Sequence, residues 1–208
     1  KINKDQEICC LKIMKNIKFI ALALLTTITL ASCSSDDDTT PEVINEEEVI
    51  TTITLTLVPE TGETVTLESR DLDGEGPNEP VITISGPLQA GMLYDGSITL
   101  ENETESPAEL INEEIEEEAD EHQFFYQAAS GVNATFAYAD TENDYMNNGV
   151  ANPVGLEFTL QAGTASSGTI TVTLRHQPAK DAAGVSAGEI ANAAGETDVQ
   201  ESFDIVIE

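Results

Sequence analysis

Alternation of apolar and polar residues with a period of two is the feature that most constrains the fold of this chain. It is clear just after Val49, where Ile53, Leu55 and Leu57 alternate with threonines. Such alternation is typical of a β-strand with one buried face. Similar segments, separated by polar turns, are 63–70, 81–84, 93–100, 122–129, 132–139, 156–160, 169–174 and 199–207. We therefore expect an all-β fold, an immunoglobulin-like two-sheet β-sandwich of about eight to nine strands.

Local signals add one hairpin and one helix to this expectation. Ser130-Gly131 separates two of the predicted strands, 122–129 and 132–139, so these are expected to form a hairpin. The segment Ser106–Glu109 has the pattern of a capping box with proline at the first helical position, which predicts an inserted helix. This helix is strongly acidic, and its apolar face would consist of Ile111, Ile115 and Ala119.

The start of the chain has the pattern of an export signal. Residues 1–13 are interpreted as an upstream extension, and residues 14–32 combine lysines, an apolar run and small residues, as a lipoprotein signal peptide does. The sequence Leu-Ala-Ser before Cys33 resembles a bacterial lipobox, which predicts lipidation of Cys33. Residues 33–48 are polar and acidic and are expected to form a tether. The folded domain is expected to span residues 49–208.

The charge of the chain excludes several classes of partner. The chain has 8 Lys and Arg against 39 Asp and Glu, for a formal net charge of −31. Removal of the leader would leave only Arg70, Arg175 and Lys180 as cations. Binding of nucleic acid needs a basic surface, so it is not expected. The membrane would instead be reached through the lipid on Cys33.

Two acidic loops have the oxygen-rich composition of Ca²⁺ sites. The first alternates acids with other residues before a glycine, as in half of a calcium loop, and its candidate ligands are Asp71, Asp73, Glu75 and Asn78. The second is looser, with Asp140, Glu142 and Asp144 as candidates. The alternative for both loops is an acidic turn that binds no metal.

The only two histidines define a second kind of candidate site. His122 follows the predicted acidic helix, and His176 follows a predicted strand. Together with Glu118 and Glu121 they could bind Zn²⁺ or a similar transition metal, provided that the two strands are neighbours. The alternative is that each histidine pairs with a carboxylate at a strand end.

Patterns of catalysis are missing from the sequence. It contains neither the GxSxG pattern of a nucleophile elbow nor a glycine-rich phosphate loop. Its carboxylates are so numerous that none marks a general acid or base. We therefore expect a protein that is not an enzyme.

Several motifs recur in one order and resemble those of a family of small flavobacterial lipoproteins. This family is commonly labelled "type 1 periplasmic binding fold superfamily protein". That name refers to a two-lobed α/β fold, whereas the residues here predict an all-β domain. The motifs that carry the resemblance are 14–33, 46–52, 69–77, 101–104, 120–125, 153–156, 174–178 and 195–198.

The resemblance implies a lipid-anchored outer-membrane protein associated with TonB-dependent receptor systems. The Ser/Asp-rich tract after Cys33 resembles a surface-export signal, so we expect exposure at the cell surface, with the periplasmic face as the alternative. The expected function is non-catalytic: accessory binding of a ligand or metal, Ca²⁺ or Zn²⁺, for uptake. The alternative is a structural or adhesion sandwich that binds protein or glycan, in which Ca²⁺ only stabilises a loop.

Overall fold

Two antiparallel sheets make up most of the computed structural model, which describes residues 48–74 and 76–208. The larger sheet has the order β3-β2-β1-β4-β8-β7, with β5 also paired to β4, and the smaller has the order β10-β9-β6. The larger sheet contains β1 (Thr52–Pro59), β2 (Val65–Arg70), β3 (Val81–Ile84), β4 (Leu93–Asn102), β5 (Glu109–Leu110), β7 (Ala134–Tyr138) and β8 (Glu157–Ala162). The smaller contains β6 (His122–Ala128), β9 (Ser166–His176) and β10 (Glu196–Ile207). The prediction of a β-rich, two-sheet fold is therefore confirmed.

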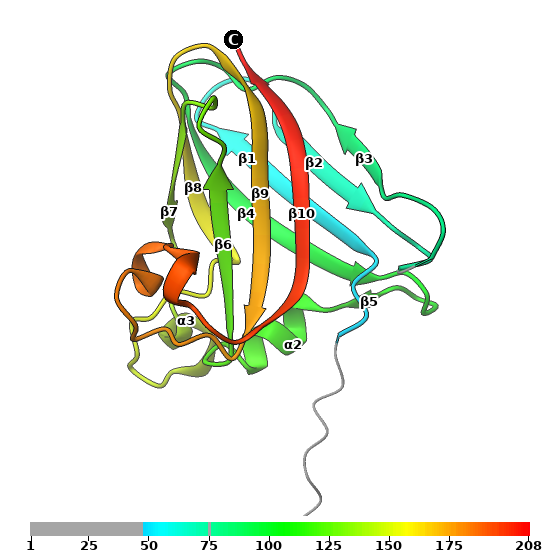
Figure 1. Cartoon of the computed structure of the whole chain (residues 1–208), viewed down its shortest axis with the longest axis vertical. Coiled ribbons are helices and arrows are strands. Elements are labelled where there is room, and N and C mark those ends of the chain that lie inside the picture. The colour runs from blue at the N-terminus through cyan, green and yellow to red at the C-terminus, as the bar shows by residue number, and fades with distance from the viewer. Residues whose placement is uncertain (1–47, 75) are drawn as a thin grey trace, which may run out of the picture. The chain divides into compact units, whose positions relative to one another are not determined.

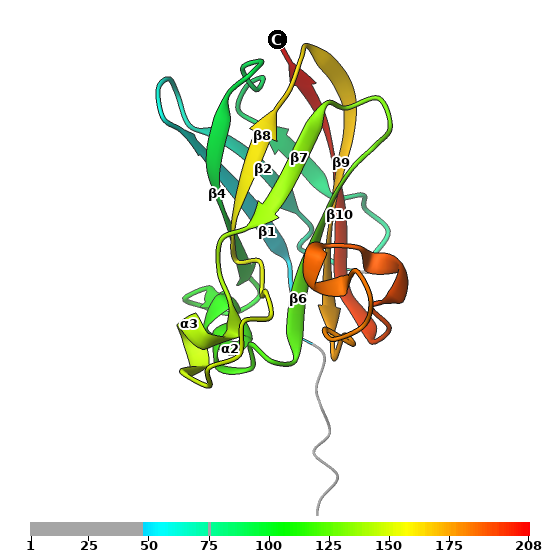
Figure 2. The same cartoon turned by 90° about the vertical axis from the view of Figure 1, so that its left-hand side faces the viewer.

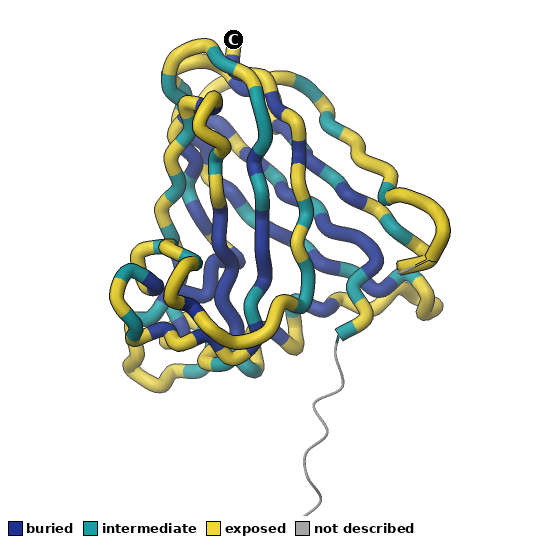
Figure 3. Tube along the Cα trace, viewed as in Figure 1, coloured by how far each residue is buried: buried dark blue, intermediate teal, exposed yellow. Residues whose placement is uncertain are grey.

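The two sheets face each other across one hydrophobic core (Figures 1 and 2). Tyr126 of the smaller sheet reaches across this core, with its ring 4.1 Å from that of Phe158 and 5.4 Å from that of Phe136. Buried residues follow the inner faces of the strands, as the period-two pattern requires (Figure 3). They include Ile53, Leu55, Leu57, Ile98, Leu100, Leu160, Ile170, Val172, Leu174, Phe203, Ile205 and Ile207.

The predicted hairpin between β6 and β7 is wrong. β6 pairs with β9 and β7 pairs with β8, so the two strands lie in different sheets. The reason is that β6 is buried on both faces. Phe124 faces the main core, while Phe125 packs with Val185 and Ala193 in a small second core. A strand with two apolar faces must be buried on both sides. The larger sheet packs on one face of β6, and the segment containing η1 (Val185–Ala187) and η2 (Ile190–Asn192) packs on the other.

The acidic helix begins later than its capping box predicts. Helix α2 spans Asn112–Glu117, because Glu109 and Leu110 instead pair with β4. Asn112 continues this attachment: its amide nitrogen donates to the carbonyl of Ile98 and its oxygen accepts from the backbone N–H of Leu100. The predicted apolar face is nevertheless confirmed, since Ile111, Ile115 and Ala119 are all buried. No helix within residues 48–74 and 76–208 is long and apolar enough to cross a membrane.

A buried ion pair joins segments that are distant in sequence. The ammonium of Lys180 lies 3.1 Å from a carboxylate oxygen of Glu142, in helix α3 (Glu142–Met146). It also donates to the backbone carbonyls of Ala119 and Pro153, at 2.5 and 3.2 Å. The side chains of Lys180 and Glu142 are each only 4% exposed. The pair therefore holds together the end of the domain where α2, α3 and the chain after β9 meet.

Replacement Lys180→Met is expected to lower the free energy of unfolding by about 3–5 kcal/mol, because it leaves the Glu142 carboxylate buried without its cation. Urea unfolding of the full chain measures this change. The double variant Lys180→Met/Glu142→Gln is expected to recover part of the loss, since it removes the unpaired charge as well. A loss below about 1 kcal/mol in the single variant would show that the pair is unimportant.

Candidate metal centre

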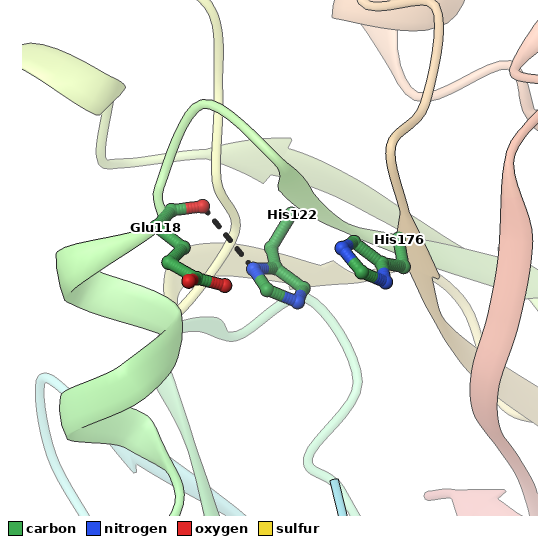
Figure 4. A group of neighbouring side chains, drawn as sticks. All are labelled: Glu118, His122 and His176. Carbon is green, nitrogen blue, oxygen red and sulfur yellow. Dashed lines mark hydrogen bonds between the residues drawn. The ribbon is translucent and has the colours of Figure 1, made fainter. Parts of the chain in front are cut away.

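The pairing of β6 with β9 brings the only two histidines together. His122 and His176 are direct partners in the register of these strands. Their rings stack with centroids 4.8 Å apart and planes 10° apart. Figure 4 shows them side by side near the end of helix α2. The condition that the sequence prediction required, neighbouring strands, is thus met.

The two ring nitrogens of His122 have different surroundings. Nδ1 lies 3.1 Å from the backbone carbonyl of Glu118, one turn earlier at the end of α2 (Figure 4). A carbonyl oxygen only accepts hydrogen bonds, so Nδ1 carries a proton and donates a hydrogen bond to the backbone carbonyl of Glu118. In the neutral ring, Nε2 is then left with a lone pair for a metal. A backbone carbonyl commonly orients metal-binding histidines in this way.

Glu48 approaches Nε2 of His122 from the start of the described chain. Its Oε1 lies 3.2 Å from that nitrogen. The side chains of Glu48 and His122 are 2% and 0% exposed, so the contact is buried. Glu48 is the last residue of the predicted tether, whereas its carboxylate is buried inside the domain.

Asp198 enters the cluster through an irregularity in β10. The register between β9 and β10 shifts between Thr197 and Val199, as at a β-bulge, so Asp198 falls outside the regular pairing. Bulges commonly redirect a side chain toward a functional site. Here the Asp198 carboxylate lies 4.0 Å from Nε2 of His122 through one oxygen and 4.0 Å from Nδ1 of His176 through the other. It is thus shared between the two histidines.

The start of β10 is held in place beside His176. Arg175 donates to the carbonyls of Ala194 and Gly195, each at 2.6 Å. Gly195 has a φ of +68°, and a Cβ on it would lie 2.2 Å from the carbonyl oxygen of His176. Only glycine allows β10 to begin this close to the end of β9. This local geometry sets the position of Asp198.

Glu121 holds His176 from the other side. Its Oε2 lies 3.4 Å from Nε2 of His176 and accepts a hydrogen bond of 2.9 Å from the side chain of Gln177. The Gln177 hydrogen bond, followed by the contact with His176, lowers the pKa of Glu121. Glu121 is 44% exposed, so it borders the cluster rather than lying within it. An ionised carboxylate at Nε2 directs Nδ1 of His176 toward Asp198.

The electrostatics of the cluster show an excess of negative charge. Contact with His122 lowers the pKa of Glu48. Burial and the nearby Glu48 charge raise the pKa of Asp198 to about 6. Burial alone would lower the pKa of His122, but Glu48, the Glu118 carbonyl and Asp198 outweigh it and raise that pKa. A positive charge on His122 is therefore favoured, as expected beside two buried carboxylates.

Several buried polar atoms of this cluster have no hydrogen-bond partner among the described residues. They are Oε2 of Glu48, Oδ2 of Asp198 and Nε2 of His122, which makes only the ion-pair contact with Glu48. Burying a polar atom without a hydrogen-bond partner costs free energy, so few such atoms occur in folded proteins. Here two carboxylate oxygens and one imidazole nitrogen of this kind lie in a single cluster. All three atom types are ligands for a cation. The arrangement therefore has the chemistry of a metal-binding group.

The donor set suits a divalent transition metal. Glu48, His122 and Asp198 form one triad whose donor atoms lie within 4.8 Å of one another, and Glu118, His122 and His176 form a second. Tetrahedral ligands around Zn²⁺ are about 3.4 Å apart, given metal–ligand distances of about 2.1 Å. The first triad is preferred. Nδ1 of His122 is already hydrogen-bonded to the carbonyl of Glu118, so Nε2 is the nitrogen left for a metal, and Nε2 faces Glu48 and Asp198. Two carboxylates also neutralise a divalent ion. His176 is not in this triad, and its stacked ring would have to rotate to become a further ligand.

The second acidic loop uses its carboxylates within the fold. Asp140 accepts from the backbone N–H groups of Gly155 and Glu157 and from the hydroxyl of Tyr145. Asp144 caps helix α3, and Glu142 pairs with Lys180. The structure does not bring these three acids together as ligands.

The first acidic loop is a hydrogen-bonded turn. Oδ1 of Asp71 accepts from the backbone N–H of Asp73, and Oδ2 of Asp73 accepts from the side chain of Asn78. Glu75, the remaining candidate ligand, lies outside the described residues, as does the predicted lipidation site Cys33. Neither metal-binding triad of the described residues includes this loop.

Glu48 and Asp198 are the two members of the centre that sequence reasoning missed. Glu48 ends an acidic run and precedes the first alternating strand, so its composition resembles that of a tether. Asp198 precedes the alternation that starts at Val199. One acid among several at the start of a strand is a weak signal, and the bulge that turns Asp198 toward the histidines is visible only in the structure.

Comparisons with protein-family models, with curated proteins and with solved structures found no match to this chain.

Proposed function

We propose that this protein is a non-catalytic, lipid-anchored protein of the outer membrane that binds one divalent transition-metal ion for an uptake system. The single observation that carries the proposal is the group of unpartnered buried atoms on Glu48, His122 and Asp198. Zn²⁺ is the favoured ion, because imidazole nitrogen and carboxylate oxygen are both among its usual ligands. Ca²⁺ and Mg²⁺ prefer oxygen ligands alone.

The shortage of cations supports this proposal. The described residues contain three cationic side chains of lysine and arginine, and each already has partners. Arg70 pairs with Glu103, Arg175 binds carbonyls beside β10, and Lys180 pairs with Glu142. Arg175 offsets part of the charge of Asp198 but is engaged with backbone carbonyls, and a metal ion from solution would supply the remaining charge.

The cellular role rests on the sequence. The lipobox-like segment before Cys33 and the resemblance to lipoproteins of TonB-dependent systems favour a place at the cell surface. A buried, nearly neutral metal site suits an accessory protein that captures an ion for an outer-membrane receptor. We assign the receptor as the partner on this basis.

Competition titration of the full chain against a chromogenic chelator tests the metal function. The expected result is one Zn²⁺ per chain with a dissociation constant below about 1 μM, and binding of Ca²⁺ at least 100-fold weaker. Binding of Ca²⁺ alone would instead favour the adhesion alternative, with an ion that stabilises a loop. Failure of every divalent ion to bind more tightly than about 1 mM would contradict the proposal.

A further inference from the structure

The buried position of the ligands raises the question of how an ion reaches them. The side chains of His122, Glu48, Asp198 and His176 are 0%, 2%, 4% and 7% exposed. A hydrated ion has to lose its water before it can bind such a set, and at least one ligand has to move to admit it. The backbone that carries each ligand indicates which one this is.

Two of the ligands, His122 and Asp198, and the neighbouring His176 are carried by hydrogen-bonded sheet. His122 and His176 are paired with each other in the β6–β9 register. Asp198 is flanked by residues of β10 that pair with β9, and Arg175 binds the carbonyls just before it. Movement of any of these residues would break strand pairing or the Arg175 contacts.

Glu48 is carried differently. Backbone hydrogen bonding of this end of the described chain begins at Thr51, whose N–H donates to the carbonyl of Glu101 and whose carbonyl accepts from the N–H of Asp71. Strand β1 follows from Thr52. Residues 48–50, here named the N-terminal strap, lie before this point, and Val49 within the strap is 55% exposed. Ile50, at the other end of the strap, is half-buried and packs against the main core. Movement of Glu48 and Val49 about Ile50 breaks no strand pairing.

We infer that Glu48 is the ligand that moves, and that the bound ion fastens the N-terminal strap to the domain. This inference rests on the proposed function and adds how the same site is loaded and emptied. When the ion is present, Glu48 completes its coordination and the strap covers His122. When the ion leaves, Glu48 keeps only its contact with His122, and the strap is no longer fastened to Asp198.

A strap fastened by the ion affects transfer of the ion to a partner. Glu48 begins the described chain and is the member of the site nearest in sequence to Cys33, the predicted anchor. A partner that draws the strap away would remove one carboxylate and lower the affinity for the ion. A partner that contacts the strap could in turn distinguish the metal-bound protein from the metal-free protein by the position of the strap.

Hydrogen exchange with and without Zn²⁺ tests whether the ion fastens the strap. In the full chain, Zn²⁺ is expected to slow exchange at the end of the strap, measured at the Thr51 amide, at least about 10-fold, because a fastened strap opens the Thr51–Glu101 hydrogen bond less often. The variant Asp198→Asn, which keeps Glu48 but weakens the site, is expected to lose this protection at the same Zn²⁺ concentration.

The rate of ion release gives an independent readout. Glu48→Ala is expected to transfer Zn²⁺ to 4-(2-pyridylazo)resorcinol at least about 10-fold faster than the unmodified chain, since changes in affinity appear mainly in dissociation rates. The matched control Glu63→Ala removes an exposed glutamate and is expected to leave the rate unchanged.

The outcomes separate the two proposals. Binding of one Zn²⁺ with unchanged strap exchange, or with equal release rates for Glu48→Ala and Glu63→Ala, would overturn the strap while leaving the metal function intact. If the full chain binds no Zn²⁺, both the proposed metal function and the proposed fastening of the strap are contradicted.

Discussion

Replacement Asp198→Asn is expected to weaken Zn²⁺ binding at least about 100-fold and, without metal, to stabilise the protein. The affinity falls because the bulge aims this carboxylate at both histidines, and its charge helps to neutralise the ion. The metal-free protein gains stability because an ionised Asp198 is buried near Glu48, which raises its pKa to about 6. Removing that repulsion is expected to add about 1–2 kcal/mol to the free energy of unfolding at pH 7.5.

The opposite signs of these two effects distinguish a metal ligand from a structural carboxylate. Chelator competition measures the affinity, and urea unfolding in EDTA measures the stability. The matched control is Asp95→Asn, which changes an exposed aspartate in β4 and should alter neither quantity. Loss of stability in metal-free Asp198→Asn, together with unchanged Zn²⁺ affinity, would show that Asp198 is a structural residue.

Zn²⁺ is expected to raise the melting temperature of the full chain by about 8–16 °C. At a free concentration 1,000-fold above the dissociation constant, binding to the folded state alone adds about 4 kcal/mol. For a protein of this size, each kcal/mol corresponds to about 2–4 °C. Scanning calorimetry at stepped Zn²⁺ concentrations measures the shift. A double variant, His122→Gln with Asp198→Asn, is the control and is expected to melt at the same temperature with and without the ion.

The pH dependence of this shift follows from the directions of the pKa changes. The folded-state pKa values of Asp198 and His122 are both raised. Each group therefore favours the metal-free folded state below its unfolded pKa, and this stability is lost as the pH rises through its folded pKa. Between about pH 4 and 6 the loss comes from Asp198, and above about pH 6.5 from His122.

A bound ion requires both groups without their protons. The increase in melting temperature caused by Zn²⁺ is therefore expected to be larger at pH 7.5 than at pH 5. An equal increase at the two pH values would mean that neither Asp198 nor His122 binds the ion.

The strands could be predicted from sequence because their signal is local. Alternation around Ile53 and around Ile205 directly reports which side of a strand faces the core. The partners of each strand could not be predicted in this way. The two apolar faces of β6 place it under the segment with η1 and η2, and that contact outweighs the hairpin signal at Ser130-Gly131. Similarly, the pairing of Glu109 with β4 overrides the capping box.

The histidines of the candidate site could be predicted from sequence, whereas its two carboxylates could not. Histidines are so few in this chain that His122 and His176 stand out, and Glu118 and Glu121 lie within one turn of His122. Asp198 and Glu48 could not be selected from 39 acids by composition. Their roles depend on a bulge in β10 and on the path of the chain before β1, which are properties of the folded structure.

Anomalous diffraction at the zinc absorption edge, from crystals of the full chain grown with Zn²⁺, tests the central claim most directly. We expect one strong peak about 2.1 Å from Nε2 of His122, with carboxylate oxygens of Glu48 and Asp198 at similar distances from the peak. A peak confined to surface acids, or to the loop of Asp71 and Asp73, with none beside His122, would contradict it.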